Sequence, residues 1–337
     1  MDSQNDKPDD DQVQPSRRRF VGSVAAGLAA PALAQAQGGG QAASGARPLA
    51  PPDYPKPPFQ KQRQDWPGLA SKMNPPPDHG ETSYRGSGKL TGRRALITGG
   101  DSGMGRAAAI AYAREGADVA INYLPAEEPD ARDVAALILQ AGRKAVLIPG
   151  DIRDEGFCKR LVDDAVKQLG GLDILVSNAA RQQSLESILD LTTAEMDQHF
   201  KTNLYAMFWI VKAAVPHLKP GSAIIVTASV QAYKPSPNLL AYASTKAAQV
   251  AFTKALSQQL APKGIRVNAV APGPVWTPLQ VAGGQTQDNL EKFGADSPMK
   301  RPGQPGELAG AYVILASAES SFTTGQVYGV TGGEGFP

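Results

Sequence analysis

The chain has 337 residues, 42% of them hydrophobic and 20% charged, which is ordinary for a globular protein. Its 34 lysines and arginines nearly balance its 32 aspartates and glutamates, and no basic stripe suggests a nucleic-acid surface. The single cysteine, Cys158, excludes an intramolecular disulfide and is expected as a helix residue in the core of the protein rather than as a reactive thiol. The three histidines lack the spacing of metal ligands, so no metal site is predicted. The balanced charge predicts no nucleic-acid partner.

Residues 1–36 have the three-part layout of an export signal. Arg17 and Arg18 precede Phe20, a small-residue apolar run follows, and Ala32-Leu33-Ala34 forms an A-x-A cleavage pattern. The paired arginines indicate the twin-arginine variant, which predicts export to the periplasm with the twin-arginine machinery as a partner. The acidic residues at 9–11 are unusual for a signal, so a disordered tail on a cytoplasmic protein is the alternative. The apolar run is too short for a stable membrane span.

Residues 37–90 are rich in proline, glycine and glutamine, which predicts an irregular arm because proline removes backbone donors and breaks helices. The segment still carries more apolar anchors than a linker needs, namely Tyr54, Phe59, Trp66, Leu69 and Met73. Two interpretations remain open. The arm lies on the body of the protein or on a neighbouring subunit, or it is a flexible spacer.

From residue 91 to residue 337, short β-branched strands alternate with longer amphipathic helices. Strands are expected over residues 93–98, 118–123, 144–150, 172–180, 222–229, 265–272 and 325–332. Helices are expected over residues 105–117, 128–142, 155–171, 194–218, 242–260 and 307–316. This alternation predicts parallel strands joined by right-handed crossovers, and hence a single doubly wound α/β domain with three αβα layers.

The sequence TGGDSGMGR, residues 98–106, follows the first predicted strand and opens the first predicted helix. Glycines at such a turn permit close approach of the backbone to a pyrophosphate, whose charge then lies at the helix N-terminus. The loop in this setting predicts a dinucleotide site.

A second group of residues carries acid–base chemistry. Tyr242 and Lys246 are four residues apart on one predicted helix and therefore share a face. A free phenol has a pKa near 10, and an adjacent ammonium favours the phenolate and lowers that pKa toward neutrality. Ser229, at the end of the preceding strand, is placed to donate a hydrogen bond to a substrate carbonyl oxygen.

From about Leu90 onward the sequence resembles the short-chain dehydrogenases/reductases. Thr-Gly-x-x-x-Gly-x-Gly is the glycine pattern of that family, and Ser229, Tyr242 and Lys246 match its catalytic triad by order and spacing. The resemblance implies a Rossmann-type fold and an NAD(P)(H)-dependent oxidoreductase. It also implies that Asn203 is the fourth catalytic member, holding a water that relays protons to the lysine. A plain polar residue at a helix start is the alternative for Asn203.

The resemblance further implies a set of cofactor contacts in which Tyr242 and Lys246 also take part. The remaining members are Thr98, Gly99, Asp101, Ser102, Gly103, Met104, Gly105, Asn122, Tyr123, Asp151, Ile152, Asn178, Ala179, Ala180, Pro272, Gly273, Val275 and Thr277. Ala180 stands where the family more commonly has glycine. The family places its substrate-covering loop at residues 279–300, whose glycines suit a mobile lid, and its members commonly form tetramers. A homotetramer or a dimer is therefore expected.

The choice of nucleotide is less direct. An acidic residue at the end of the second strand would bind the ribose 2′-hydroxyl and favour NAD(H), but this chain has Asn122, Tyr123 and Leu124 there. The missing carboxylate leaves room for a 2′-phosphate, so NADP(H) is preferred. NAD(H) stays possible because no arginine adjoins Tyr123 and because Asp101 would repel a phosphate if it pointed there.

The arm and the first half of the domain resemble more narrowly a subgroup with extended N-termini. It comprises general-stress and glucose/ribitol-dehydrogenase-like proteins and NADP-dependent aldehyde reductases. This resemblance strengthens the preference for NADP(H) and implies reduction of aldehydes or ketones to alcohols. Two alternatives stay open. One is a sugar or polyol dehydrogenase working in the oxidative direction, and the other is a non-catalytic dinucleotide-binding scaffold.

Overall fold

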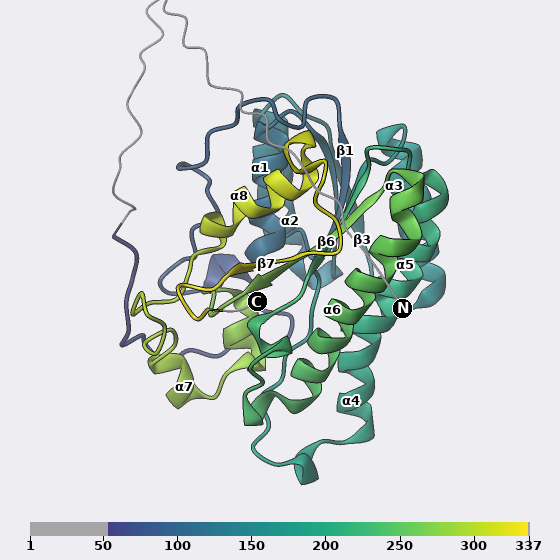
Figure 1. Ribbon diagram of the computed structural model, residues 1–337. Coiled ribbons are helices and arrows are strands. Elements are labelled where there is room, and N and C mark those ends of the chain that lie inside the picture. Colours follow the sequence, from purple (N-terminus) through teal and green to yellow (C-terminus); the bar gives the residue numbers. More distant parts are fainter. Residues whose placement is uncertain (1–52, 336–337) are drawn as a thin grey trace, which may run out of the picture. The chain divides into compact units, whose positions relative to one another are not determined.

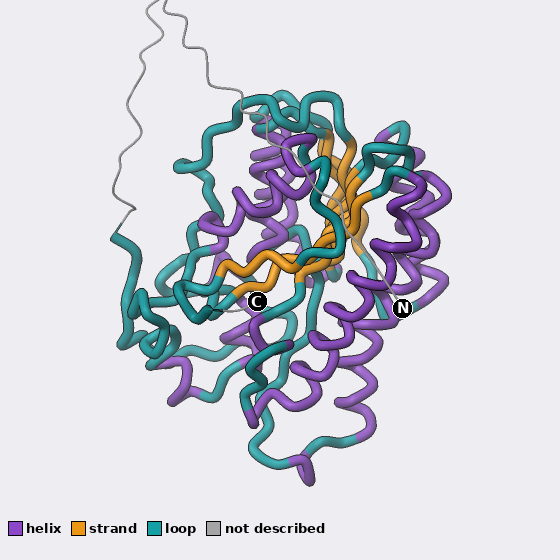
Figure 2. The backbone as a smooth tube through the Cα atoms, viewed as in Figure 1, coloured by secondary structure: helices purple, strands orange, loops and turns teal. Residues whose placement is uncertain are grey.

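A computed structural model describes residues 53–335 of the chain. The expected signal, residues 1–36, and the first part of the expected arm lie outside the described residues. A seven-stranded parallel sheet forms the centre of the described part (Figures 1 and 2). Its strands are β1 (Arg94–Thr98), β2 (Asp118–Tyr123), β3 (Ala145–Pro149), β4 (Ile174–Ser177), β5 (Ala223–Thr227), β6 (Arg266–Pro272) and β7 (Val327–Val330).

The strand order is β3-β2-β1-β4-β5-β6-β7, so the order reverses between β1 and β4. All neighbours are parallel, and in this register Thr98 pairs with Asn122 while Ile97 pairs with Val176. The carboxyl ends of the strands therefore share one edge of the sheet, where ligands of doubly wound folds bind. The predicted Rossmann-type α/β fold is confirmed.

Helices cover both faces of the sheet (Figure 1). One face carries α1 (Gly103–Arg114), α2 (Glu128–Gln140) and α8 (Pro305–Ala316), and the other carries α3 (Glu155–Leu169), α5 (Ala206–Ala214) and α6 (Leu240–Leu260). Strand side chains alternate between the two cores as the period of two requires. In β1, Ala95 and Ile97 face the α1 side, whereas Leu96 faces the α3 side. None of the described helices is long and apolar enough to cross a membrane.

The helix expected over residues 194–218 is not continuous. It begins as α4 (Thr193–Phe200), widens into a π-helical turn over Lys201–Tyr205, and continues as α5. Such a turn adds one residue to the helical repeat and is often found at functional sites. Here it contains Asn203, whose side chain bonds to groups outside its own helix.

Residues 53–90 form an irregular arm, as expected, with one 3₁₀ turn at Ala70–Lys72. The arm lies on the body of the same chain. Phe59 stacks on Trp276 with ring centroids 4.3 Å apart, and its backbone N–H donates to Glu291 O at 2.9 Å. Farther along, the Ala70 N–H donates to the buried carboxylate of Asp130 at 2.6 Å. The flexible-spacer interpretation does not describe this part of the arm.

Truncation of Phe59 tests how firmly the arm is anchored. Phe59→Ala should lower the free energy of unfolding by about 3 kcal/mol, because burial and stacking on Trp276 are both lost. Thermal unfolding and limited proteolysis within residues 53–76 measure the effect. Phe322→Ala is the matched control, since Phe322 is fully exposed and its truncation should leave the melting temperature unchanged. Equal behaviour of the two variants would contradict the anchoring role.

Candidate functional site

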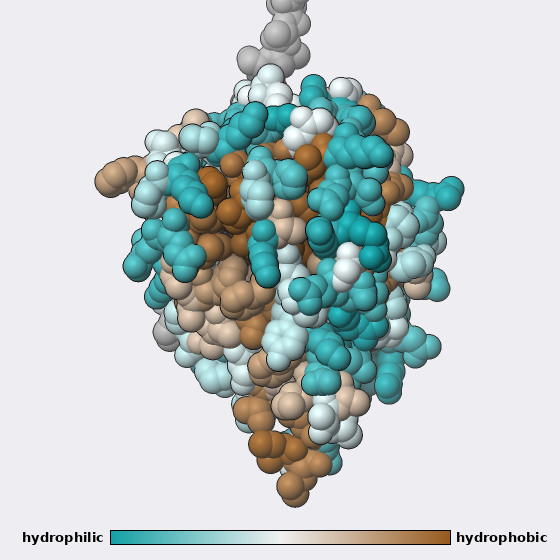
Figure 3. Space-filling view, turned by 90° about the vertical axis from the view of Figure 1, so that its right-hand side faces the viewer, coloured by the Kyte–Doolittle hydropathy of each residue, from teal (hydrophilic) through white to brown (hydrophobic). Residues whose placement is uncertain are grey.

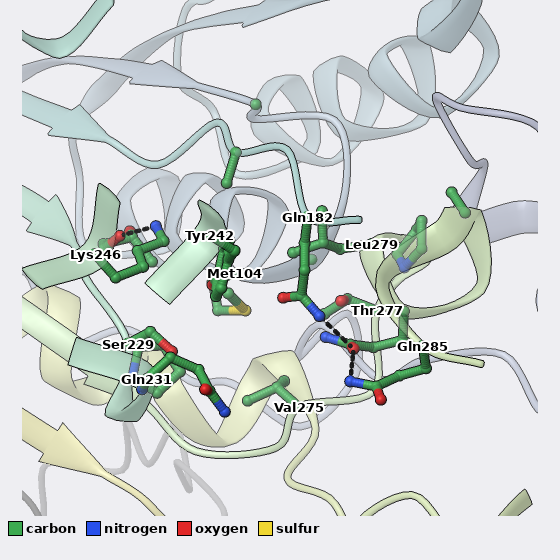
Figure 4. Close-up of a pocket in the computed structure, with 18 of the residues that line it drawn as sticks. Met104, Gln182, Ser229, Gln231, Tyr242, Lys246, Val275, Thr277, Leu279 and Gln285 are labelled. Atoms are coloured by element: carbon green, nitrogen blue, oxygen red, sulfur yellow. Dashed lines mark hydrogen bonds between the residues drawn. The ribbon is translucent and has the colours of Figure 1, made fainter. Parts of the chain in front are cut away.

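A cavity of about 630 Å³ lies at the carboxyl ends of the strands (Figure 4). Most of the predicted site residues line it. They are Gly99, Asp101, Ser102, Gly103, Met104, Asn122, Tyr123, Asp151, Ile152, Asn178, Ala179, Ala180, Ser229, Tyr242, Lys246, Pro272, Gly273, Val275 and Thr277. The cavity lining does not include three predicted residues, Thr98, Gly105 and Asn203. Thr98 Oγ1 accepts from the backbone N–H groups of Asn178 and Ala179, which do line the cavity.

The glycine loop between β1 and α1 is folded tightly. Gly99 adopts a positive φ of 60°, and a Cβ on Gly105 would lie 1.9 Å from Gly99 O. Asn178 stabilises the loop from β4, since its Nδ2 donates to Gly99 O at 3.0 Å and its backbone N–H donates to Thr98 Oγ1 at 3.0 Å. The first turn of α1 therefore opens into the cavity without an obstructing side chain from Gly103. Unpaired N–H groups and the helix dipole there fit the diphosphate of a dinucleotide.

Tyr242 and Lys246 are both buried in the cavity wall. Burial raises the pKa of Tyr242 to about 12, and a hydrogen bond with Ser229 acts in the opposite direction. Burial also lowers the pKa of Lys246 to about 7. The Lys246 Nζ lies 5.3 Å from the Tyr242 ring centroid and donates to Thr227 O at 2.7 Å.

The expected lowering of the Tyr242 pKa is therefore wrong for this structure. The expectation considered only the attraction between an ammonium and a phenolate. In the folded chain both groups leave water, and desolvation disfavours the charged form of each. At neutral pH Tyr242 is a protonated donor beside a lysine that is close to its own midpoint.

The Asn203 side chain bonds to two segments next to the cavity. Its Oδ1 accepts from Arg181 N at 2.7 Å, and its Nδ2 donates to Thr245 Oγ1 at 3.0 Å. Its backbone carbonyl accepts from Gln249 Nε2, and Gln249 Oε1 accepts from Lys246 Nζ at 3.0 Å. The Gln249 side-chain amide thus links the Asn203 carbonyl to the lysine, and the water relay implied by the resemblance stays a prediction.

Gln249 belongs to no motif in the sequence. The signal that could have identified it is its position three residues after Lys246, on the same face of α6.

The arm also reaches the site, which the sequence did not predict. Trp66, Pro67 and Gly68 line the cavity. The Trp66 ring lies between two guanidinium groups, with Arg153 Cζ at 5.3 Å and Arg181 Cζ at 5.0 Å from its centroid. Arg153 is paired with Asp151 at 2.6 Å. The sequence feature that could have indicated this contact is Trp66, a large aromatic residue in a proline-rich segment.

Side-chain amides line the end of the cavity next to Thr277 and Leu279, where Figure 4 shows Gln182 and Gln285. Gln182 Nε2 and Gln285 Nε2 both donate to Gln280 Oε1, at 3.4 Å and 3.1 Å, and Gln231 also lines the cavity. Amides donate and accept hydrogen bonds without carrying charge, so this end suits hydroxyl and carbonyl groups.

The expected covering segment, residues 279–300, does form this wall, with a turn at Gln280–Gly284 and the short helix α7 (Gln287–Glu291).

Other candidate chemistry is not supported by the described part of the chain. Cys158 is buried, its Sγ donates to Ile152 O at 3.0 Å, and burial raises its thiol pKa to about 12. Within residues 53–335, no group of three or more histidine, cysteine, aspartate or glutamate side chains could hold a metal ion.

Comparison with known proteins agrees with this geometry. Residues 99–334 match the protein family described as enoyl-(acyl carrier protein) reductase. The chain is 60% identical over 278 residues to the uncharacterized oxidoreductase YhxD of Bacillus subtilis, covering 82% of this chain and 93% of that protein. It is 51% identical over 282 residues to general stress protein 39 of Bacillus subtilis, with coverage of 83% and 98%. Glucose and ribitol dehydrogenase of Daucus carota is 43% identical over 281 residues, with coverage of 82% and 96%.

Solved structures share the fold. A short-chain dehydrogenase from Burkholderia cenocepacia in complex with NADP superposes with a TM-score of 0.68 at 34% identity, covering 73% of this chain and 98% of that one. A 3-ketoacyl-(acyl-carrier-protein) reductase from Brucella melitensis complexed with NADH gives a TM-score of 0.67 at 34% identity, covering 73% and 100%. The chain therefore belongs to the short-chain dehydrogenase/reductase family of NAD(P)-dependent oxidoreductases.

Proposed function

We propose that the protein reduces an aldehyde or ketone to an alcohol with a nicotinamide dinucleotide. The observation that carries this proposal is the convergence of Ser229, Tyr242 and Lys246 in one cavity with a glycine loop that fits a diphosphate. A bound dinucleotide supplies or accepts the hydride. The chain's own residues bind, orient and move the proton.

In this proposal the Tyr242 hydroxyl donates a proton to the carbonyl oxygen as the alcohol forms. Ser229 donates a hydrogen bond to the same oxygen and holds it next to the phenol. Lys246 stabilises the phenolate left behind, and Gln249 and Thr227 fix the lysine Nζ. Burial keeps Tyr242 protonated at neutral pH, and a protonated phenol supports carbonyl reduction at that pH. The rate of alcohol oxidation should increase as pH rises, because oxidation needs the deprotonated phenol.

Oxidation of a polyol or sugar is the second candidate. It is favoured by the amide lining at the substrate end, since neutral amides suit a chain of hydroxyl groups better than a charged substrate. The Daucus carota relative is named for glucose and ribitol. The non-catalytic scaffold stays an outcome of the tests below.

A homotetramer also stays a proposal. Two surfaces with exposed apolar side chains support it, one with Tyr205 and Phe208 at the start of α5 and one with Ile314 on α8 and Tyr328 on β7. The face shown in Figure 3 carries apolar areas beside hydrophilic ones. Export through the twin-arginine machinery to the periplasm is likewise proposed from residues 1–36 alone.

Tyr242→Phe tests the proton donor. Turnover of an aldehyde, ketone and polyol panel should fall at least about 100-fold, because phenylalanine has no proton to give. The affinity for NADH and NADPH, measured by fluorescence titration, should change less than about twofold. Tyr328→Phe, at an exposed tyrosine outside the cavity, is the control and should retain full activity. Wild-type rates in Tyr242→Phe would contradict the mechanism, and dinucleotide binding without turnover by the wild-type protein would favour the scaffold.

Gln249→Met tests the amide link. Loss of the acceptor at 3.0 Å from Nζ disfavours the ammonium, so the phenolate of Tyr242 loses support. The pH profile of alcohol oxidation should then move to higher pH, with kcat lowered about tenfold near neutrality. Gln249→Glu keeps an acceptor for Nζ and should return the profile to the wild-type pH or below. If both variants lose stability and keep the wild-type profile, the role of Gln249 is only structural.

Trp66→Ala tests the contribution of the arm to nucleotide binding. Removal of a ring that lines the cavity between Arg153 and Arg181 should weaken NADH or NADPH binding about tenfold. Calorimetry on the full chain gives the dissociation constants. Trp209→Ala, at a partly buried tryptophan on α5 outside the cavity, is the matched control. An unchanged affinity in Trp66→Ala would show that the arm only covers the site.

A further inference from the structure

The side-chain amide of Gln182 has one fixed orientation in the cavity wall. Its Nε2 donates to the backbone carbonyl of Gly284 at 2.8 Å and to Gln280 Oε1 at 3.4 Å. A carbonyl oxygen accepts hydrogen bonds and never donates them, so the amide nitrogen must face Gly284 and the amide oxygen must face away from it. Figure 4 shows the Gln182 oxygen on the side of Tyr242 and the nitrogen on the side of Gln285.

The Gln182 oxygen is a free acceptor that opens on the cavity. The residue is 4% exposed, and within residues 53–335 its Oε1 accepts no hydrogen bond. This oxygen is not one of the polar atoms that are wholly enclosed without a partner, so its exposed area faces the cavity that Gln182 lines. A ligand that displaces water from such an acceptor without supplying a donor binds at a cost in free energy. The Gln182 oxygen is therefore arranged for a donor on a ligand.

The residues on both sides of Gln182 are held by the wall behind it. The Arg181 N–H donates to Asn203 Oδ1 at 2.7 Å, and the Arg181 carbonyl accepts from Asn203 Nδ2 at 2.9 Å. The Gln183 N–H donates at 3.1 Å to Nε2 of His199, whose side chain is completely buried. These bonds fix the backbone of the segment, so the Gln182 oxygen is preorganised toward the cavity.

The neighbouring amides differ in what they offer a ligand. Gln280 Oε1 accepts from both Gln182 and Gln285, so these two amide nitrogens are directed at the covering segment. Both ends of the Gln231 amide are bonded to Ser236, since Nε2 donates to Ser236 Oγ at 3.0 Å and Oε1 accepts from Ser236 N at 2.6 Å. Gln182 thus presents a free acceptor where Gln231 does not. Because an amide carries no charge, a hydroxyl suits this acceptor better than an ammonium group, whose burial needs a counter-charge.

We propose that Gln182 is a specificity-determining residue, whose Oε1 accepts a hydrogen bond from a hydroxyl group close to the carbonyl carbon that is reduced. The substrates are then hydroxy-aldehydes or hydroxy-ketones. Plain alkyl carbonyl compounds are poor substrates, because they leave the Gln182 oxygen without a donor. This inference rests on the proposed function and names its substrate class more closely.

The first test compares 2-hydroxybutanal and 3-hydroxybutanal with butanal, which has the same carbon chain and no hydroxyl. In the wild-type protein kcat/KM should be at least about tenfold higher for one of the hydroxylated aldehydes than for butanal. Gln182→Met removes the acceptor and keeps the length of the side chain, so it should reduce this preference at least about fivefold. The inductive effect of the hydroxyl on the carbonyl is the same in every variant and cancels when the preferences are compared.

Two further variants separate recognition of the substrate from support of the covering segment. Gln182→Glu loses the donor to Gly284 but keeps an acceptor for the hydroxyl, so its preference should stay within about twofold of the wild-type value. Gln231→Met is the matched control, and it should leave the preference unchanged whatever its effect on the overall rate. Thermal unfolding reports the folding of each variant, and Gln182→Leu serves if Gln182→Met does not fold.

Two outcomes of this comparison would overturn the proposal. One is an unchanged preference in folded Gln182→Met. The other is loss of the preference in folded Gln182→Glu as well, because the amide nitrogen would then be the group that matters. If carbonyl compounds are reduced in either case, the proposed function stands and only the inference fails.

A binding measurement without turnover makes the opposite separation. Butane-1,2-diol, butane-1,3-diol and butan-1-ol are the alcohols that form from the three aldehydes, and saturation-transfer NMR on the full chain with NADH or NADPH reports their binding. The wild-type protein should bind one diol at least about fivefold more tightly than butan-1-ol, and Gln182→Met should lose this difference. If the difference is found but no carbonyl compound is reduced, the inference stands and the proposed function fails. Equal diol selectivity in the wild-type protein and in Gln182→Met would overturn the inference.

Discussion

The reversal of strand order between β1 and β4 determines where the loops that form the cavity lie. All strands are parallel, so each one delivers its following loop to the same edge, and the loops diverge where the order reverses. Three of these loops are tied together. Asn178 after β4 donates to Gly99 O and accepts from Thr227 Oγ1 at 3.1 Å, and Thr227 O in turn accepts from Lys246. The glycine loop and the lysine are therefore parts of one hydrogen-bonded framework.

The arm adds a second constraint, because it joins the substrate side to the nucleotide side. Phe59 and Met73 share an apolar cluster with Trp276, Val281, Leu290 and Phe293, which belong to the segment after β6. The same arm presents Trp66 to the cavity near Asp151. A mobile lid at residues 279–300, as the sequence suggested, would have to break these contacts or carry the arm with it. We therefore expect a movement of residues 279–300 to affect both ends of the cavity.

Local sequence signals were sufficient for the fold and for naming most of the residues that the structure brings together around one cavity. Alternating periodicity placed the strands and helices, and spacing along one helix placed Tyr242 and Lys246 together. The contributions of Gln249 and Trp66 could not be predicted, because each depends on side chains brought together from distant segments. Gln249 reaches a carbonyl 46 residues away, for example. The predicted direction of the Tyr242 pKa shift was wrong for the same reason, because burial depends on the folded chain and not on the motif alone.

Coupling between the arm and the nucleotide bears on the export expected from residues 1–36. The twin-arginine pathway carries folded proteins, and a dinucleotide that binds only the folded state stabilises it in proportion to its free concentration over its dissociation constant. Outside the cytoplasm that free concentration is lost, so an exported enzyme keeps its nucleotide only if dissociation is slow. The arm adds contacts that could slow dissociation, because Trp66–Gly68 line the cavity while Phe59 stacks on Trp276. We therefore propose that the activity of an exported form would depend on an intact arm more strongly than that of a cytoplasmic form, to which free nucleotide stays available.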